Sequence, residues 1–218
     1  MRDKSLSVAG LIVLFASLSI FGLSARAGER LPGLPDCGPK QAKTLRQNPD
    51  IRLFRGPASN DESPPVFGCL KPNGRSIRLG PLSAQGPIWA SSMTDPYGLS
   101  RPWAAGVEVQ LRGQDSVRIY LTSRDLRTGA RRHCLIGGAD RPGQLPRVRR
   151  LEMAANGTAV WAAVIHLGIK GAQIGACDAG GSRIIAAGPS IEIKSVEVQG
   201  TTVRWVEAGN SRTASLVG

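Results

Sequence analysis

Short runs of alternating apolar and polar residues, each ended by a turn signal, fill the chain from Lys43 onward. A period of two is typical of a β-strand with one buried face. Clear examples are Ile51–Arg55, Val107–Leu111 and Thr202–Glu207. No segment of this range shows a convincing helical period, so the pattern predicts an all-β protein.

The runs fall into four groups, which predict about four blade-like antiparallel sheets of three or four strands, with the last sheet one strand short. The expected strands are Ile51–Arg55, Val66–Leu70 and Ser76–Leu79; Ile88–Ala90, Val107–Leu111, Ser116–Ser123 and Arg131–Ile136; Val148–Ala154, Thr158–Ile165, Gln173–Cys177 and Arg183–Ala186; and Ser195–Val198, Thr202–Glu207 and Thr213–Val217. The segment Met93–Ala105 is rich in Pro, Gly and Ser and is expected to be a loop.

One stretch occurs twice. Residues 151–161 (LEMAANGTAVW) return as 196–205 (VEVQGTTVRW), each with an alternating run, a tight Gly turn and a second run carrying Trp. A spacing of about 45 residues is the period of a four-stranded propeller blade. Because Trp161 and Trp205 recur in equivalent strands, we expect them to pack between blades.

The segments VRRLEMAANGTAVWAA (148–163), SRDLRTGARR (123–132) and GSRIIAAG (181–188) resemble repeats in secreted actinobacterial proteins of the β-propeller type, similar to distant WD-repeat or TolB-type blades. The resemblance covers about residues 43–217 and implies a small or incomplete propeller. The chain contains no Trp-Asp dipeptide and is short for a ring of six to eight blades. A four-bladed ring, an open array and an irregular β-sandwich all remain open.

The N-terminus has the organisation of an export signal. Arg2 and Lys4 precede a mostly apolar run from Leu6 to Leu23, and Ala25-Arg26-Ala27 provides small residues at a cleavage site. We expect a signal peptide over residues 1–27, an irregular lead-in over 28–42 and a single domain over 43–218. The alternative is a retained membrane anchor, which Gly10, Gly22 and the serines of the run disfavour.

All four cysteines follow the predicted cleavage site. An even number in an oxidising compartment indicates two disulfides, and four cysteines allow three pairings. We expect Cys37–Cys69 and Cys134–Cys177, because these partners are nearest in sequence. No spacing of Cys or His predicts a metal site, and no motif predicts a cofactor.

The chain is strongly basic, with a formal net charge of +12, which becomes +10 without Arg2, Lys4, Arg26 and Asp3. Such a charge favours anionic partners, for which we expect a cell-envelope polymer or a protein, with no nucleic acid. The alternative is that the arginines only occupy solvent-exposed strand faces and bind no partner, since they are spread along the chain.

The sequence contains no convincing catalytic motif. A serine hydrolase needs a His base, but His133 adjoins Cys134 and His166 lies in an apolar run, and no Gly-x-Ser-x-Gly segment occurs. Glu152 and Glu197 occupy matching positions of the duplicated stretch and could form a carboxylate pair. The alternative for both glutamates is that they lie on the solvent-exposed face of an alternating strand and have no catalytic role.

Among the four tryptophans, Trp89, Trp103, Trp161 and Trp205, we expect Trp103 to be exposed and name it as a ligand-binding candidate. The sequence therefore predicts a secreted, disulfide-stabilised binding module of unknown ligand. The alternative is an extracellular hydrolase that uses Glu152 and Glu197 at the mouth of the array.

Overall fold

The computed structural model describes residues 37–39, 41–57, 64–71, 74–80, 88–112, 116–139, 145–165 and 171–216. Within these ranges the chain is all-β, with fifteen strands in four antiparallel sheets. This confirms the fold class that the alternating pattern predicts, including a last sheet of three strands.

Each sheet is formed by consecutive strands, so every connection within a sheet joins neighbours. The first sheet contains β1 (Thr44–Gln47), β2 (Ile51–Arg55), β3 (Val66–Leu70) and β4 (Ile77–Gly80). The second contains β5 (Ile88–Ser100), β6 (Trp103–Arg112), β7 (Ser116–Asp125) and β8 (Arg131–Ala139). The third contains β9 (Arg147–Met153), β10 (Ala159–Ile165), β11 (Gly171–Asp178) and β12 (Gly181–Gly188). The fourth contains β13 (Ile191–Gln199), β14 (Thr202–Glu207) and β15 (Asn210–Ser215).

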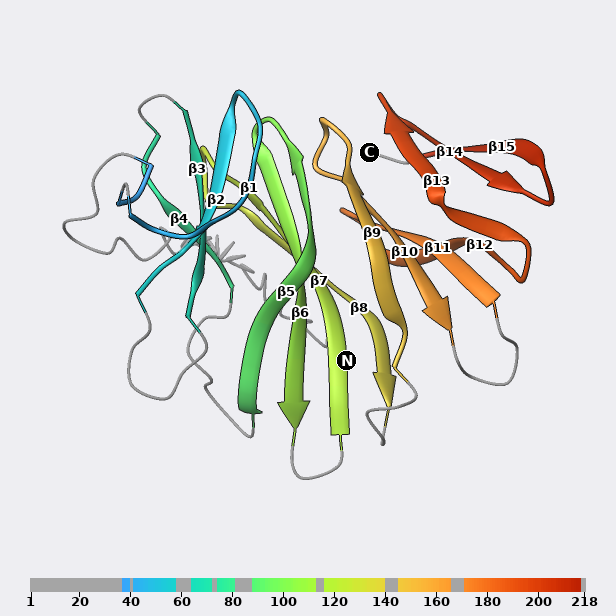
Figure 1. The fold of residues 1–218 in the computed structure, drawn as a ribbon, viewed down its shortest axis with the longest axis horizontal. Helices are drawn as coiled ribbons and strands as arrows, with labels where there is room; N and C mark the ends of the chain where they lie inside the picture. The colour runs from blue at the N-terminus through green and yellow to red at the C-terminus, as the bar shows by residue number, and fades with distance from the viewer. Residues whose placement is uncertain are drawn as a thin grey trace, which may run out of the picture.

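The four sheets lie side by side in a row (Figure 1), with the first sheet at one end and the fourth at the other. Each interface between successive sheets has its own apolar core. Leu53 and Leu79 pack with Tyr97 of the second sheet, Leu121 packs with Trp161 of the third, and the third and fourth sheets enclose a further cluster. The core is therefore divided into three layers, as alternating strands require when both faces of an inner sheet are covered.

Two disulfides reinforce this row. One joins Cys37 of the lead-in to Cys69 on β3, and the other joins Cys134 on β8 to Cys177 on β11. This is the pairing expected from sequence spacing. The second bond is a crosslink between the second and third sheets.

The expected loop Met93–Ala105 is wrong, because these residues belong to the long β5–β6 hairpin. Two prolines there suggested a loop, but a proline is tolerated where no ladder hydrogen bond is needed. Pro96 lies at an irregularity of the β5–β6 register, and Pro102 lies in the turn between the strands. Sequence analysis also missed β1, which is almost wholly exposed and does not alternate.

The two similar stretches form equivalent hairpins, β9–β10 and β13–β14. Trp161 is fully buried against the second sheet, and Trp205 is buried against the third. Each tryptophan thus packs toward the preceding sheet, in agreement with the packing role expected for both. The proposed signal peptide (1–27), His166 and the turn at Gly113–Asp115 lie outside the described residues.

Candidate functional site: a cationic cavity along the first strands

A cavity of about 640 Å³ opens along the side of the molecule formed by the first strand of each sheet. It is lined by one residue of β1, one of β5, four of β9 and two of β13: Arg46, Pro96, Arg149, Arg150, Leu151, Glu152, Ile193 and Lys194. These four strands run along the near side of the row in Figure 1. The volume lies within the range of pockets that hold small organic ligands.

Each of the four lining strands is irregular where it meets the cavity. The register shifts between Thr44 and Arg46 on β1, and between Thr94 and Tyr97 on β5. On β9, Arg150 and Val148 pair with consecutive residues of β10, so Arg149 is the bulged residue. On β13 the register is interrupted between Glu192 and Glu197. Bulges bend a strand and turn side chains in new directions, and they are frequent beside functional sites.

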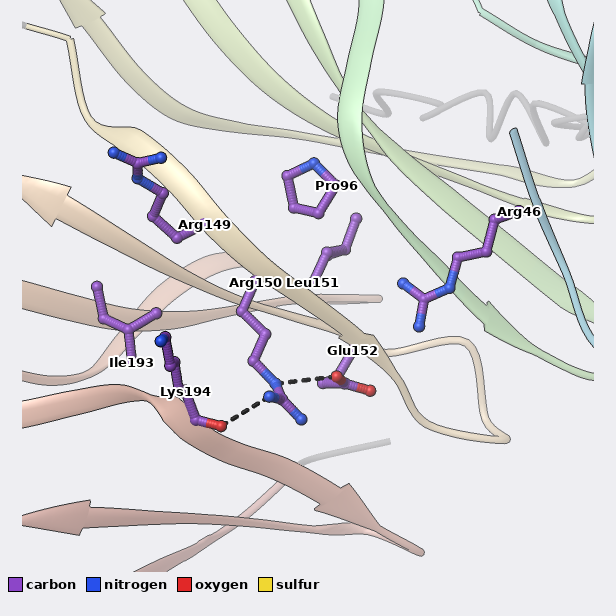
Figure 2. Close-up of a pocket in the computed structure, with 8 residues that line it drawn as sticks. All are labelled: Arg46, Pro96, Arg149, Arg150, Leu151, Glu152, Ile193 and Lys194. Carbon is purple, nitrogen blue, oxygen red and sulfur yellow. Dashed lines mark hydrogen bonds and ion pairs between the residues drawn. The ribbon is translucent and has the colours of Figure 1, made fainter. Parts of the chain in front are cut away.

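Two arginines join neighbouring sheets at these irregularities. Arg46 donates from Nη1 to the carbonyl oxygen of Tyr97 in the next sheet. Arg150 likewise donates from Nη1 to the carbonyl oxygen of Lys194 at 2.7 Å (Figure 2). Both arginines therefore hold neighbouring sheets together while their remaining N–H groups line the cavity.

The cavity has an excess of positive charge. Among the described residues, its lining contains Arg46, Arg149, Arg150 and Lys194 but a single carboxylate, Glu152. That carboxylate is paired with Arg150, with 3.0 Å between Nε and Oε1. Arg149 and the Lys194 ammonium are exposed and form no hydrogen bond or ion pair with another described side chain. The arrangement can therefore bind anions without first breaking a protein contact at these two groups.

The two glutamates of the hydrolase alternative are placed differently. Glu152 lines the cavity beside Arg150, whereas Glu197 is exposed on β13 opposite Arg204 and does not line it. The structure does not bring them together in one lining, although they occupy similar hairpins. A hydrolytic pair must face the same substrate from two sides.

The expected exposure of Trp103 is wrong, because Trp103 is half-buried at the start of β6, between Arg132 and the β9–β10 turn. The guanidinium of Arg132 lies 4.7 Å from its ring centroid, and Arg132 also donates to the carbonyl oxygen of Asn156. A Cβ on Gly157 would lie 2.3 Å from the Trp103 ring, and the φ of +84° there also requires glycine. Trp103 thus packs the β9–β10 turn against the second sheet.

A buried polar cluster on the second sheet escaped sequence analysis. Glu108 is only 1% exposed, and its carboxylate accepts hydrogen bonds from Gln110 (2.7 Å), Thr122 (2.9 Å) and Arg131 (3.2 Å). The Nε2 of His133 lies 4.0 Å from the same carboxylate. Alternation along β6 could have shown that Glu108 and Gln110 share a face, but not that this face is covered.

Arg124 extends the Glu108 cluster toward the turn after β7. Burial lowers the pKa of its guanidinium, and the neighbouring Arg131 acts in the same direction, whereas Glu108 opposes it. Arg124 donates to the carbonyl oxygen of Gly129 at 2.9 Å. The Glu108 carboxylate is enclosed and accepts three hydrogen bonds, so it is not an open reacting group.

The part of the chain that the structure describes contains no group of three or more His, Cys, Asp or Glu placed to hold a metal ion. In the same part, no helix is long and apolar enough to cross a membrane. Neither protein-family models nor curated proteins match this chain. The cavity along the first strands is therefore interpreted from its own geometry and charge.

Proposed function

We propose that this protein is an extracytoplasmic binding module that holds an anionic ligand in the cavity along its first strands. The observation that carries the proposal is the lining itself, in which four cationic side chains surround one carboxylate that is already paired. Strand bulges aim several of these side chains into one space. A basic chain of this kind also attracts anions from a distance.

Location outside the cytoplasm is supported by the two disulfides, since such bonds persist in oxidising compartments. The predicted signal peptide agrees with this location. Expression in a host that exports the protein, followed by N-terminal sequencing, should give Gly28 as the first residue. Recovery of the intact N-terminus from a membrane fraction would instead favour the anchor alternative.

Retention on an anionic chromatography matrix tests whether the positive charges of the cavity bind anions more strongly than positive charges elsewhere on the surface. We expect the double variant Arg149→Gln/Lys194→Gln to elute at a clearly lower salt concentration than the double variant Arg118→Gln/Arg204→Gln. Arg118 and Arg204 are exposed and lie outside the cavity, so both variants lose two charges. Equal elution would show that net charge alone governs binding, which contradicts the proposal.

A further inference from the structure

The cationic groups of the cavity are spread over three sheets. Arg46 belongs to the first sheet, Arg149 and Arg150 to the third, and Lys194 to the fourth. Packed sheets lie about 10 Å apart. Figure 2 shows Arg46 and Arg149 far apart in this view, with Arg150 between them. One compact anion cannot contact all of these groups, so the arrangement favours a ligand with several charges along its length.

The hydrogen-bonding character of the lining restricts the chemistry of that ligand. Arginine and lysine side chains only donate, and the sole side-chain acceptor of the lining, Glu152, is already paired. A neutral ligand that relies on hydroxyl or amide donors alone would lose hydrogen bonds to water and find no unpaired side-chain acceptor in this lining. Ionised phosphate oxygens only accept, and they match the fork of an arginine.

The apolar part of the lining is aliphatic. It consists of Pro96, Leu151 and Ile193, and none of the described residues that line the cavity is aromatic. Proteins that bind single-stranded nucleic acids stack the bases on aromatic side chains. A polymer without flat rings fits this lining better.

We propose that the cavity binds a linear phosphate polymer with a non-aromatic backbone, laid across the first strands of successive sheets. This inference rests on the proposed anion-binding function and specifies its ligand class. Two sources share the chemistry: inorganic polyphosphate, and polyols linked by phosphodiesters. Arg46, Arg149 and Lys194 contact phosphates at intervals along the polymer, while Glu152 neutralises Arg150.

The test is equilibrium binding of fluorescent probes to the exported, disulfide-bonded protein at several salt concentrations. The probes are inorganic polyphosphate of defined length, poly(glycerol phosphate), polyglutamate and a single-stranded oligonucleotide. Three net phosphate contacts on a flexible strand correspond to a salt slope of about −2, so affinity for the preferred phosphate polymer should fall about 20-fold from about 50 to 200 mM salt. Preference for one of the two phosphate polymers identifies the source.

Variants separate the site from bulk charge. Arg149→Gln/Lys194→Gln should reduce the salt effect to about threefold, because one net contact remains, whereas Arg118→Gln/Arg204→Gln should leave it unchanged. Equal binding of polyglutamate overturns the phosphate assignment, and equal binding of the oligonucleotide overturns the non-aromatic backbone. Orthophosphate is added as an unlabelled competitor, and competition as strong as that of the unlabelled polymers overturns the linear ligand. If the chromatography result holds while no phosphate polymer binds, this inference fails and the anion-binding function stands.

Discussion

At the scale of single residues, Glu108 shows how a charged group is accommodated between sheets. Its carboxylate accepts three hydrogen bonds, one of them from the half-buried Arg131. Removal of one partner from a buried ion pair costs about 3–5 kcal/mol. Because the Arg131 side chain is 26% exposed, we expect Glu108→Ala to lower the free energy of unfolding by about 2–4 kcal/mol. Urea unfolding followed by circular dichroism measures the change.

Glu108→Gln is the matched control for that change. The new amide nitrogen at position 108 would face the amide nitrogen of Gln110, which now donates to Glu108. The Oε1 of Gln110 has no hydrogen-bond partner among the described residues and can accept in its place. Reorientation of the Gln110 amide would therefore satisfy the substitution, and we expect a loss of only about 1 kcal/mol. Equal destabilisation by both substitutions would contradict the proposed network.

Tyr97 gives the fold a dependence on alkaline pH. Burial, aided by the charge of Asp95, raises the pKa of its hydroxyl to about 12. The contribution of Tyr97 is complete below pH about 10, the pKa of an unfolded tyrosine, and is lost as the pH rises toward 12. As the pH rises from about 8 to about 11.5, the free energy of unfolding should fall more steeply for the native chain than for Tyr97→Phe. Parallel curves would remove Tyr97 as the cause.

At the scale of elements, the β13 bulge depends on one hydroxyl group. Ser195 Oγ accepts from the backbone N–H of Val206 at 2.7 Å and donates to the carbonyl oxygen of Glu192 at 2.6 Å. Ser195→Ala leaves both groups without this partner, which should cost about 1–2 kcal/mol. It should also weaken retention on the anionic matrix, because Lys194 loses its fixed position. Ser211→Ala on exposed β15 is the control and should change neither property.

The same irregularities explain which elements the sequence could predict. Strands that carry no bulge of their own, such as β2 and β14, have the predicted bounds. The sequence predicts only Ile88–Ala90 of β5, because the Pro, Gly and Ser residues from Met93 onward indicate a loop, and the strand has a register irregularity between Thr94 and Tyr97. An inserted residue necessarily breaks a period of two. The cavity residues Pro96, Arg149 and Lys194 lie at such breaks. The alternation of apolar and polar residues, which predicts the sheets, therefore gives no indication of the cavity.

At the scale of the whole molecule, the row of sheets should unfold less cooperatively when its crosslink is removed. The substantial contacts between sheets join only successive ones, as in linear repeat proteins, whose stability is a sum of interface terms. Cys134–Cys177 spans the central interface and closes a loop whose ends are 43 residues apart. In the chain-entropy model such a loop contributes about 4 kcal/mol. Its removal lowers overall stability and uncouples the two halves of the row.

We therefore expect Cys134→Ala/Cys177→Ala to unfold with a lower denaturant slope and with separate transitions by fluorescence and circular dichroism. Trp161 reports on the central interface and Trp205 on the interface between the third and fourth sheets, so Trp161→Phe and Trp205→Phe backgrounds assign each transition. Cys37→Ala/Cys69→Ala removes a bond of similar entropic size, about 3.7 kcal/mol, that does not join two sheets. That variant should be destabilised yet keep one coincident transition. Coincident transitions in both variants would mean that apolar packing alone couples the sheets.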